Sequence, residues 1–364
     1  VYFHDGSFAD VGRIVAAGGD LSNADFLAGQ YRFDDLQGRV TNAGVLRGQR
    51  IDLLGRSVAN FGHVETPDGS FLMAAGRTIQ LRDHDSPIVI ESVLTSFDAG
   101  PAVENTGSVD AGSGQVRMVA GDMLAFAVRS SGSIRAGNIH IEGGEGGLVE
   151  VRGELDASDR GMASGDAAPE GGKIDVLGDF VSIQAGARLD ASGEAGGGRI
   201  RVGGDRHGAG TVRTARGTFV HADAELRADA TVEGDGGEII VWADETAQIY
   251  GALSATGGPL GGFGGFAETS GKQWLDVTRA PDLRALGARP GETGGDWLID
   301  PNNINIVADA CDPALPTCLD PGLAPGQLVN PLFPFNGGPV VRPTNNLDPD
   351  TGEPLDSEIQ AGLI

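Results

Sequence analysis

The feature that most limits the fold of this chain is a short pattern, Gly-Gly-x-apolar-x-apolar, which recurs through its second half. Each copy is typical of a turn followed by a short strand with one buried face. Four strong copies begin at Gly146, Gly171, Gly197 and Gly236, and a weaker copy begins at Gly264. These intervals are similar in length, except for a longer one after Gly197, and they indicate a repeat protein whose units stack on one another. We expect the first apolar residues of the strong copies to form one strand ladder, which would contain Val149, Ile174, Ile200 and Ile239.

A second pattern, Leu-x-Ala, follows each strong copy after a variable interval. Because side chains alternate between the two faces of a strand, Leu and Ala are expected to point inward together. The predicted inward core ladder contains Leu155, Leu189, Leu226, Leu253, Ala157, Ala191, Ala228 and Ala255. The residue between Leu and Ala changes from copy to copy, and we expect this outward position to face solvent in each case: Asp156, Asp190, Arg227 and Ser254.

The glycine content excludes most other folds. The chain of 364 residues contains 60 glycines, and average usage is only about 7%. Long helices are disfavoured because each interior glycine costs about 1 kcal/mol relative to alanine. Collagen is excluded because the glycines do not recur at every third position. Two or three short strands per repeat indicate a parallel β-helix, whereas an antiparallel sandwich would show hairpin dipeptides and no stacking of equivalent residues.

The organisation along the chain changes near Asp300. Before it, turns at Asn42, Asn60 and Asn105 each lead into a short apolar strand, and Asn tolerates the backbone angles of such turns. The segment 301–364 holds most of the prolines of the chain and few of its glycines. Since proline is rare inside strands, we expect the coils to end near Ile306. The predicted parts are a β-helical region at 1–130, β-helix repeats at 131–306, and a Pro-rich acidic tail or linker at 307–364.

The net charge restricts the partners. The chain has 26 Lys and Arg against 51 Asp and Glu, which gives a formal charge of −25. Nucleic acid is therefore not expected as a partner, because phosphate binding needs clustered cations. No apolar run approaches the roughly 20 residues of a membrane helix, and no signal peptide is visible at Val1.

Several strings, taken in their order along the chain, resemble a known family. Val11–Ala17, Asp20–Phe26 and Gly38–Gly44 look like the amino-terminal secretion domain of filamentous haemagglutinin-type exoproteins, which are exported by two-partner secretion. Four later strings resemble the segment that follows in large members of the family: Gly236–Trp242, Gly257–Phe266, Ser270–Lys272 and Leu298–Ile304. The resemblance covers roughly residues 1–306 and implies that 1–130 is the C-terminal part of the secretion domain.

This resemblance sets the expected fold and setting. The fold class is all-β, a right-handed parallel β-helix (solenoid) with a Pro-rich irregular C-terminal tail. The implied partner is an outer-membrane two-partner secretion transporter, and the implied localisation is secreted or at the cell surface of a Gram-negative bacterium. The family's Asn-Pro-Asn-Gly turn is missing, and Ser357–Ala361 looks like the start of a further strand unit. We therefore expect a piece truncated at both ends.

Few residues carry candidate chemistry. Cys311 and Cys318 bracket a short Pro-containing loop, and in an exported protein such a pair is expected to form a local disulfide. The six histidines show no spacing typical of a metal site or a triad, and residues 83–86 are expected to form a polar loop. The glycine run at 257–265 lacks the Gly-Lys-Ser/Thr ending of a phosphate loop. No cofactor and no metal are expected.

The functional interpretation favours a structural role over catalysis. Parallel β-helices also carry polysaccharide-cleaving enzymes, which need converging carboxylates. Asp156 and Asp190 could stack, but Arg227 and Ser254 interrupt that row. We expect a non-enzymatic, adhesin-like rod that binds glycans or proteins of host or neighbouring cells, or associates with itself. Two alternatives stay open: a structural subunit of an extracellular filament, sheath or matrix, and a carbohydrate-active β-helix enzyme.

Overall fold

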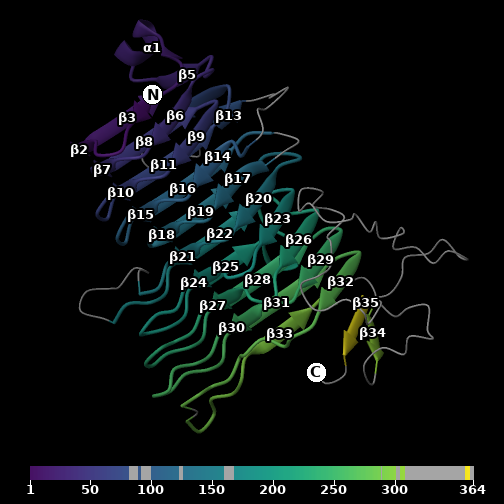
Figure 1. Cartoon of the computed structure of the whole chain (residues 1–364). Helices are drawn as coiled ribbons and strands as arrows, with labels where there is room; N and C mark the ends of the chain where they lie inside the picture. Colours follow the sequence, from purple (N-terminus) through teal and green to yellow (C-terminus); the bar gives the residue numbers. More distant parts are fainter. Residues whose placement is uncertain are drawn as a thin grey trace, which may run out of the picture.

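Successive coils of the chain stack into one elongated body (Figure 1). The structure is a computed structural model that describes residues 1–81, 89–91, 100–122, 126–159, 168–287, 289–300, 304–307 and 357–360. Within these residues, three parallel sheets contain twelve, nine and ten strands, here named sheets A, B and C. The structure confirms the predicted parallel β-helix.

Each complete coil passes through sheets A, B and C in that order. The strands of sheet A, in spatial order, are β1 (Tyr2–Phe3), β6 (Arg39–Asn42), β9 (Ser57–Asn60), β14 (Val103–Asn105), β17 (Phe126–Ser130), β20 (Leu148–Val151), β23 (Phe180–Ile183), β26 (Gly217–Val220), β29 (Thr246–Ile249), β32 (Trp274–Val277), β35 (Ser357–Gln360) and β34 (Ile304–Val307). Those of sheet B are β2 (Phe8–Asp10), β7 (Val45–Arg47), β10 (His63–Glu65), β15 (Ser108–Asp110), β18 (Ser133–Arg135), β21 (Glu154–Asp156), β24 (Arg188–Asp190), β27 (Glu225–Arg227) and β30 (Ala252–Ser254). Those of sheet C are β3 (Arg13–Ala17), β8 (Arg50–Gly55), β11 (Ser70–Ala75), β16 (Gln115–Ala120), β19 (Asn138–Glu142), β22 (Lys173–Leu177), β25 (Arg199–Val202), β28 (Glu238–Ala243), β31 (Phe266–Gly271) and β33 (Asp296–Ile299).

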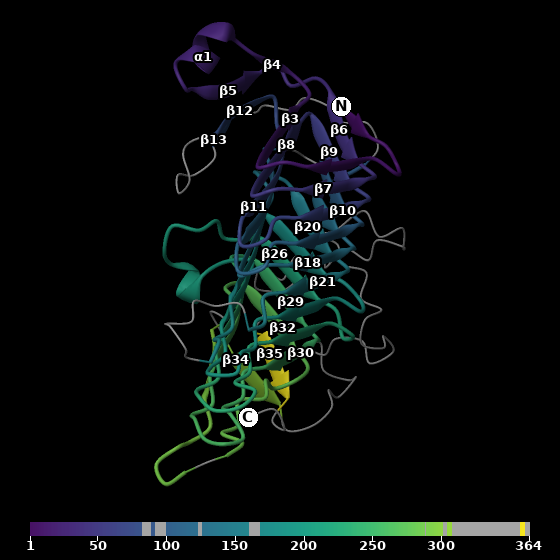
Figure 2. The ribbon, with the colours of Figure 1, turned by 90° about the vertical axis from the view of Figure 1, so that its left-hand side faces the viewer.

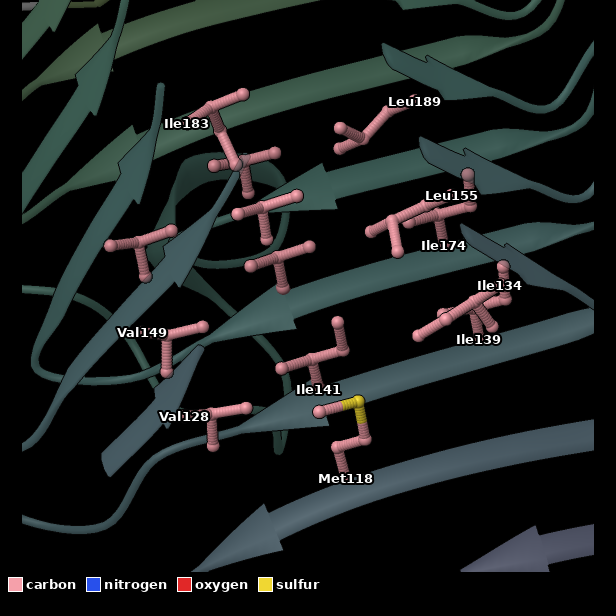
Figure 3. Packing of buried hydrophobic residues seen from close by; sticks show 14 of the residues in the cluster. Met118, Val128, Ile134, Ile139, Ile141, Val149, Leu155, Ile174, Ile183 and Leu189 are labelled. Atoms are coloured by element: carbon pink, nitrogen blue, oxygen red, sulfur yellow. The ribbon is translucent and has the colours of Figure 1, made fainter. Parts of the chain in front are cut away.

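The interior is built from ladders of similar apolar side chains, one from each coil. Leu155 pairs in register with Leu189, and the ladder continues through Leu226 to Leu253, all at most 5% exposed. The alanines that follow these strands are fully buried: Ala157, Ala191, Ala228 and Ala255. Figure 3 shows side chains of successive coils, including Leu155 and Leu189, stacked in the interior. Burying one such leucine contributes about 1.5–3 kcal/mol relative to leaving it exposed.

The expected strand ladder needs one correction. Three of its four residues pair in register in sheet C: Ile174, Ile200 and Ile239. Val149 lies instead in sheet A, where it pairs with Val181, so the prediction was wrong there. The reason is that Gly146 and Gly147 precede β20, a strand of sheet A, whereas the other three Gly-Gly pairs precede strands of sheet C. The same short motif can precede a strand in either sheet, because it specifies only a turn and an alternating strand.

The remaining Gly-Gly pairs close the corner between sheets B and C. In each coil the amide of the second glycine donates to the carbonyl oxygen of the Leu-x-Ala alanine. These bonds are Gly172 to Ala157 at 2.8 Å, Gly198 to Ala191 at 2.7 Å, Gly237 to Ala228 at 2.7 Å, and Gly265 to Ala255 at 2.8 Å. They hold the coil together across the segment between the two patterns. The described segments 192–196, 229–235 and 256–263 leave the coil there as loops. The variable repeat length reflects in part the variable length of these loops.

The glycines of these pairs have no room for a side chain. A Cβ on Gly198 would overlap backbone atoms of Gly171 and Gly172 in the preceding coil, and a Cβ on Gly197 would overlap the backbone of Ala228 in the next. The same close approach recurs at Gly237. Glycine is needed here because neighbouring coils come into backbone contact.

The corner between sheets A and B carries a ladder of buried asparagines in the first coils. The side-chain amide of Asn42 donates to the oxygen of Asn60 at 2.9 Å, and Asn60 donates to Asn105 at 2.8 Å. All three residues are fully buried. These bonds offset the cost of removing polar amides from water.

A small antiparallel sheet, sheet D, was not anticipated from the sequence. It contains β13 (Val89–Glu91), β12 (Thr78–Leu81), β5 (Tyr31–Asp34) and β4 (Asp20–Leu21), and the short helix α1 (Asn23–Leu27) lies beside it. Figure 2 shows α1 and β5 at the amino-terminal end of the stack. Phe33 and Ile79 of sheet D cluster with Leu54 and Leu72, which sheet C would otherwise expose to water. Sheet D therefore covers an apolar outer patch of the first coils.

Among the described residues, no helix combines the length and the apolar character needed to cross a membrane. Sheets A, B and C all continue across residue 130. The domain boundaries at 130 and 306 stay predictions. The Pro-rich tail lies outside the described residues except for β34 and β35.

The glycine corners can be tested by adding one methyl group. We expect Gly198→Ala to lower the free energy of unfolding by about 1–3 kcal/mol, as overpacking does in other proteins. The matched control is Gly294→Ala, because its Cβ would meet only the Leu283 carbonyl oxygen, at 3.4 Å. Denaturant unfolding followed by circular dichroism measures both. Equal stability of the two variants would contradict the backbone-contact explanation.

Candidate functional site

The outward positions of the Leu-x-Ala strands differ in their burial. They lie in one row of sheet B, in register: Asp156, Asp190, Arg227 and Ser254. Arg227 is exposed, as expected, but Asp156 is only 6% exposed. Its carboxylate accepts a hydrogen bond from Arg135 Nε at 2.9 Å and another from the hydroxyl of Ser158. The prediction of a solvent-facing Asp156 was wrong because neighbouring side chains cover it, and an ion-paired carboxylate is poorly suited to general acid catalysis.

The outer face of sheet C carries a denser group of charges. Four residues from successive coils pair in register there: Arg117, His140, Asp175 and Arg201. Glu142 lies two residues after His140 in β19 and so points from the same face. We call these five residues the charged row. They come from four strands that neighbour one another in space although they are far apart in the sequence.

His140 lies between two carboxylates of the charged row. Its Nε2 is 2.9 Å from Glu142, and its Nδ1 is 3.6 Å from Asp175. Burial by itself lowers the pKa of His140, but the hydrogen bonds to Asp175 and Glu142 outweigh it and raise the pKa above its ordinary value. The hydrogen bond with His140 in turn lowers the pKa of Glu142. The three groups therefore stabilise one another when the imidazole is charged.

Asp175 is also held by an arginine. Arg201 donates from Nε at 2.7 Å and from Nη2 at 2.9 Å to its two carboxylate oxygens, a bidentate geometry that favours strong pairing. Burial by itself raises the pKa of Asp175, but the hydrogen bonds from His140 and Arg201 outweigh it and hold the pKa well below its usual range. His140, Glu142, Asp175 and Arg201 thus form one paired network, whereas Nε of Arg117, the fifth residue of the charged row, is buried without a hydrogen-bond partner.

An insertion at 203–216, between β25 and β26, flanks the charged row and is anchored to it. Asp205 accepts a hydrogen bond from Arg201, and Arg213 donates to Asp179 at 2.9 Å. Within the insertion, the helical turn η1 (Arg206–Gly208) approaches the buried indole of Trp242 through Gly208. Figure 2 shows the insertion as the teal loop and helical turn that project from the stack.

The insertion also brings three possible ligand groups together. His207 in η1, Glu268 in β31 and Asp300 just after β33 each offer an atom, and these atoms all lie within 4.8 Å of one another. Glu268 is fully buried. Its carboxylate oxygens accept the backbone amide of His207 at 3.1 and 3.2 Å and the hydroxyl of Ser270 at 2.9 Å. Burial raises the pKa of Glu268, and the donors from Ser270 and His207 offset this only in part.

This three-residue cluster, His207, Glu268 and Asp300, is not arranged for nucleophilic catalysis. The Ser270 hydroxyl donates to Glu268, whereas the His207 ring contacts Asp300 at 3.5 Å. A nucleophile and its base need a direct hydrogen bond, and these contacts do not provide one. A nitrogen and two carboxylates that converge from three elements are instead typical of a cation-binding arrangement.

A groove also follows the corner between sheets A and B. Its lining includes glycines of successive coils, such as Gly62 and Gly107, together with Phe61, His63 and Ser108. His63 Nδ1 and the Ser108 hydroxyl are 2.8 Å apart, and Phe61 is 44% exposed. The shallow groove is therefore lined by an aromatic side chain and by polar groups.

The sequence did not predict the three-residue cluster, because His207 is 61 and 93 positions away from its partners. The only signal was indirect: the insertion lengthens the interval between the copies at Gly197 and Gly236. Two predicted features lie outside the described residues, namely the Cys311–Cys318 disulfide and the polar loop at 83–86. The glycine run at 257–265 forms an external loop that hydrogen-bonds to the loop of the preceding coil, with Leu260 donating to Val232 at 3.0 Å.

Comparison with known proteins supports the architecture. No protein-family model matches the sequence, and a search of curated proteins finds no significant match. Among solved structures, the chain is similar to the crystal structure of the HMW1 secretion domain from Haemophilus influenzae, with a TM-score of 0.60 and 24% sequence identity. The similarity covers 80% of this chain and 76% of that chain. At this identity the likeness shows a shared fold.

The charged row predicts a pH-dependent stability. Because the folded state raises the pKa of His140, its contribution is fully present below the ordinary pKa of about 6.5 and is lost as the pH rises through the folded pKa. We expect wild type to lose stability relative to His140→Gln as the pH is raised from about 5.5 to 9. The lowered pKa of Asp175 acts only at strongly acidic pH and leaves this window unchanged.

Chemical unfolding at a series of pH values measures this difference. His221→Gln is the control, because its ring lies 3.7 Å from Asp223, a carboxylate that is 77% exposed. The control leaves the contacts of His140 with Glu142 and Asp175 in place, so we expect it to lose stability with rising pH relative to His140→Gln, as wild type does. A constant difference between wild type and His140→Gln across the pH range would contradict the prediction.

Proposed function

We propose that this chain belongs to a secreted β-helical exoprotein of a Gram-negative bacterium, exported by two-partner secretion and acting as a rigid adhesin-like rod. The observation that carries the proposal is the shared fold with the HMW1 secretion domain over 80% of the chain. The family strings at Val11–Ala17 and Gly38–Gly44 support the same assignment to the haemagglutinin type, since both lie in the first coils.

A stack of parallel coils suits the mechanical role. Each coil adds about 4.8 Å, the ordinary spacing of neighbouring strands, and is bonded to the next along all three sheets. The constant character of the interior leaves the outer positions free to vary, as they do between Asp190, Arg227 and Ser254. A rod of this kind carries outer side chains away from the cell while changing little in its core.

Binding without turnover is the second part of the proposal. The groove beside Phe61 and His63 has the aromatic and polar groups that glycan or protein ligands need. The pairing of Asp156 with Arg135 favours a non-enzymatic role, because it leaves that carboxylate ion-paired. The partners proposed are therefore an outer-membrane transporter for export and a surface glycan or protein for adhesion.

A second candidate function, a subunit of an extracellular filament, sheath or matrix, is favoured by one observation. Four large apolar side chains are 41–61% exposed on the stacked loops of the last coils: Val232, Leu260, Phe263 and Leu286. Exposed apolar groups in neighbouring loops are suited to self-association. Electron microscopy of the purified protein separates the two functions, because regular polymers are expected only of a filament subunit.

Export is tested with the full-length protein in a Gram-negative host, with and without the two-partner transporter of the same genome. We expect the protein in the medium or at the cell surface only when the transporter is present, measured by immunoblot of cell fractions. A transporter that lacks its periplasmic docking domains serves as the control and is expected to abolish export. Equal export in all three strains would contradict the proposed route.

The absence of catalysis is tested on a panel of acidic and neutral polysaccharides. We expect no release of oligosaccharides and no new reducing ends with wild-type protein, and the same result with Asp156→Ala and Asp190→Ala. Saturable binding to a glycan array or to cells is expected in parallel. Product released by wild type and lost in either variant would overturn the non-enzymatic assignment in favour of a carbohydrate-active enzyme.

A further inference from the structure

Some carboxylates that point outward from the coils are covered by neighbouring side chains, and nearly all of these buried carboxylates form an ion pair with an arginine. In the described residues, five of the six buried carboxylates have a guanidinium nitrogen within 3.1 Å. These pairs are Asp52 with Arg50, Glu150 with Arg129, Asp156 with Arg135, Asp175 with Arg201, and Asp229 with Arg227. The sixth is Glu268. Its hydrogen-bond donors are the backbone amide of His207 and the hydroxyl of Ser270, which carry no charge.

An unmatched buried carboxylate is costly. Moving a charge out of water costs several kcal/mol unless a counter-charge or a metal offsets it. Within the described residues, no arginine or lysine forms an ion pair with Glu268; the groups that act on its charge are His207 and Asp300. Asp300 adds a second negative charge and makes the deficit larger. Among the described residues, every other buried carboxylate has an arginine partner, and Glu268 has none.

The geometry around Glu268 fits a metal ion. Zinc bonds to histidine nitrogen and carboxylate oxygen at about 2.0–2.2 Å in a tetrahedral arrangement, so two ligands of one ion lie about 3.3–3.6 Å apart. The His207, Glu268 and Asp300 ligand atoms lie within 4.8 Å of one another. Rotations of the exposed His207 and half-buried Asp300 side chains would shorten these distances to those of zinc ligands. Glu268, the buried member, would be the fixed ligand.

We propose that His207, Glu268 and Asp300 form a binding site for a zinc-class divalent cation. The imidazole selects this class over calcium, which takes six to eight oxygen ligands. The ion would join the insertion at 203–216 to β31 and to the segment that follows β33, so it would act as a clamp between three elements. Three protein ligands leave a fourth position for water.

The test uses the whole chain, freed of metal with a chelator and titrated with zinc chloride by isothermal calorimetry. We expect one zinc per chain, a rise in the melting temperature on zinc addition, and no saturable binding of calcium chloride. Glu268→Gln keeps the shape of the side chain and removes its charge. His207→Asn removes the imidazole and keeps a residue that accepts the left-handed backbone of His207, whose φ is 57°.

Each variant is expected to weaken zinc binding at least about tenfold, since even the loss of an outer-shell partner costs about 10–100-fold. His221→Gln, at a His–Asp contact elsewhere, is expected to bind as wild type does. Circular dichroism checks that the variants are folded, and His207→Asn decides the question if Glu268→Gln unfolds. The site is refuted if wild type binds no zinc, or if both variants bind it as tightly as wild type does. Neither outcome bears on export, which does not use this site.

Discussion

The backbone contact between successive coils is the constraint on which the rest of this structure depends. At the corner between sheets B and C, glycines such as Gly171, Gly197 and Gly198 meet the backbone of the neighbouring coils with no space for a Cβ. Because no side chain intervenes there, the coils can approach to the ordinary strand spacing of about 4.8 Å, at which all three sheets pair in register. The apolar ladders of the interior follow, because a fixed register places equivalent residues above one another. The buried asparagine ladder of the first coils follows for the same reason.

The same register organises the outer surface. One outward residue from each coil joins a row, so residues far apart in sequence become neighbours. On sheet C this produces the charged row, in which pairing raises the pKa of His140 and lowers that of Asp175. Insertions leave the coil on its outside, as loops or as sheet D, and one insertion can contact several coils. The insertion at 203–216 contacts two later coils, where His207 lies close to Glu268 and Asp300.

Much of the fold could be predicted because its signals are local. The Leu-x-Ala alternation is sufficient to place Leu155 and Leu189 inward. The placement of Val149 failed because Gly-Gly-x-apolar-x-apolar describes a turn and a strand and does not say which of the three sheets the strand joins. The burial of Asp156 failed because it depends on Arg135 in the preceding coil. Sheet D could not be foreseen, because its strands are short and come from two separate insertions.

The sequence by itself determined the parallel β-helix and its interior, since alternation and glycine turns act between residues adjacent in the chain. Only the tertiary structure decided which charges are buried, which are paired and which lack a partner. The physical reason is that lateral neighbours are separated by a whole coil of variable length, as the pairing of Val58 with both Val40 and Val103 illustrates. The number of residues between such neighbours depends on insertions of variable length, so the sequence shows no fixed period from which the neighbours could be predicted. Glu268 is therefore an ordinary strand residue in the sequence and the one buried carboxylate without an arginine in the described part of the fold.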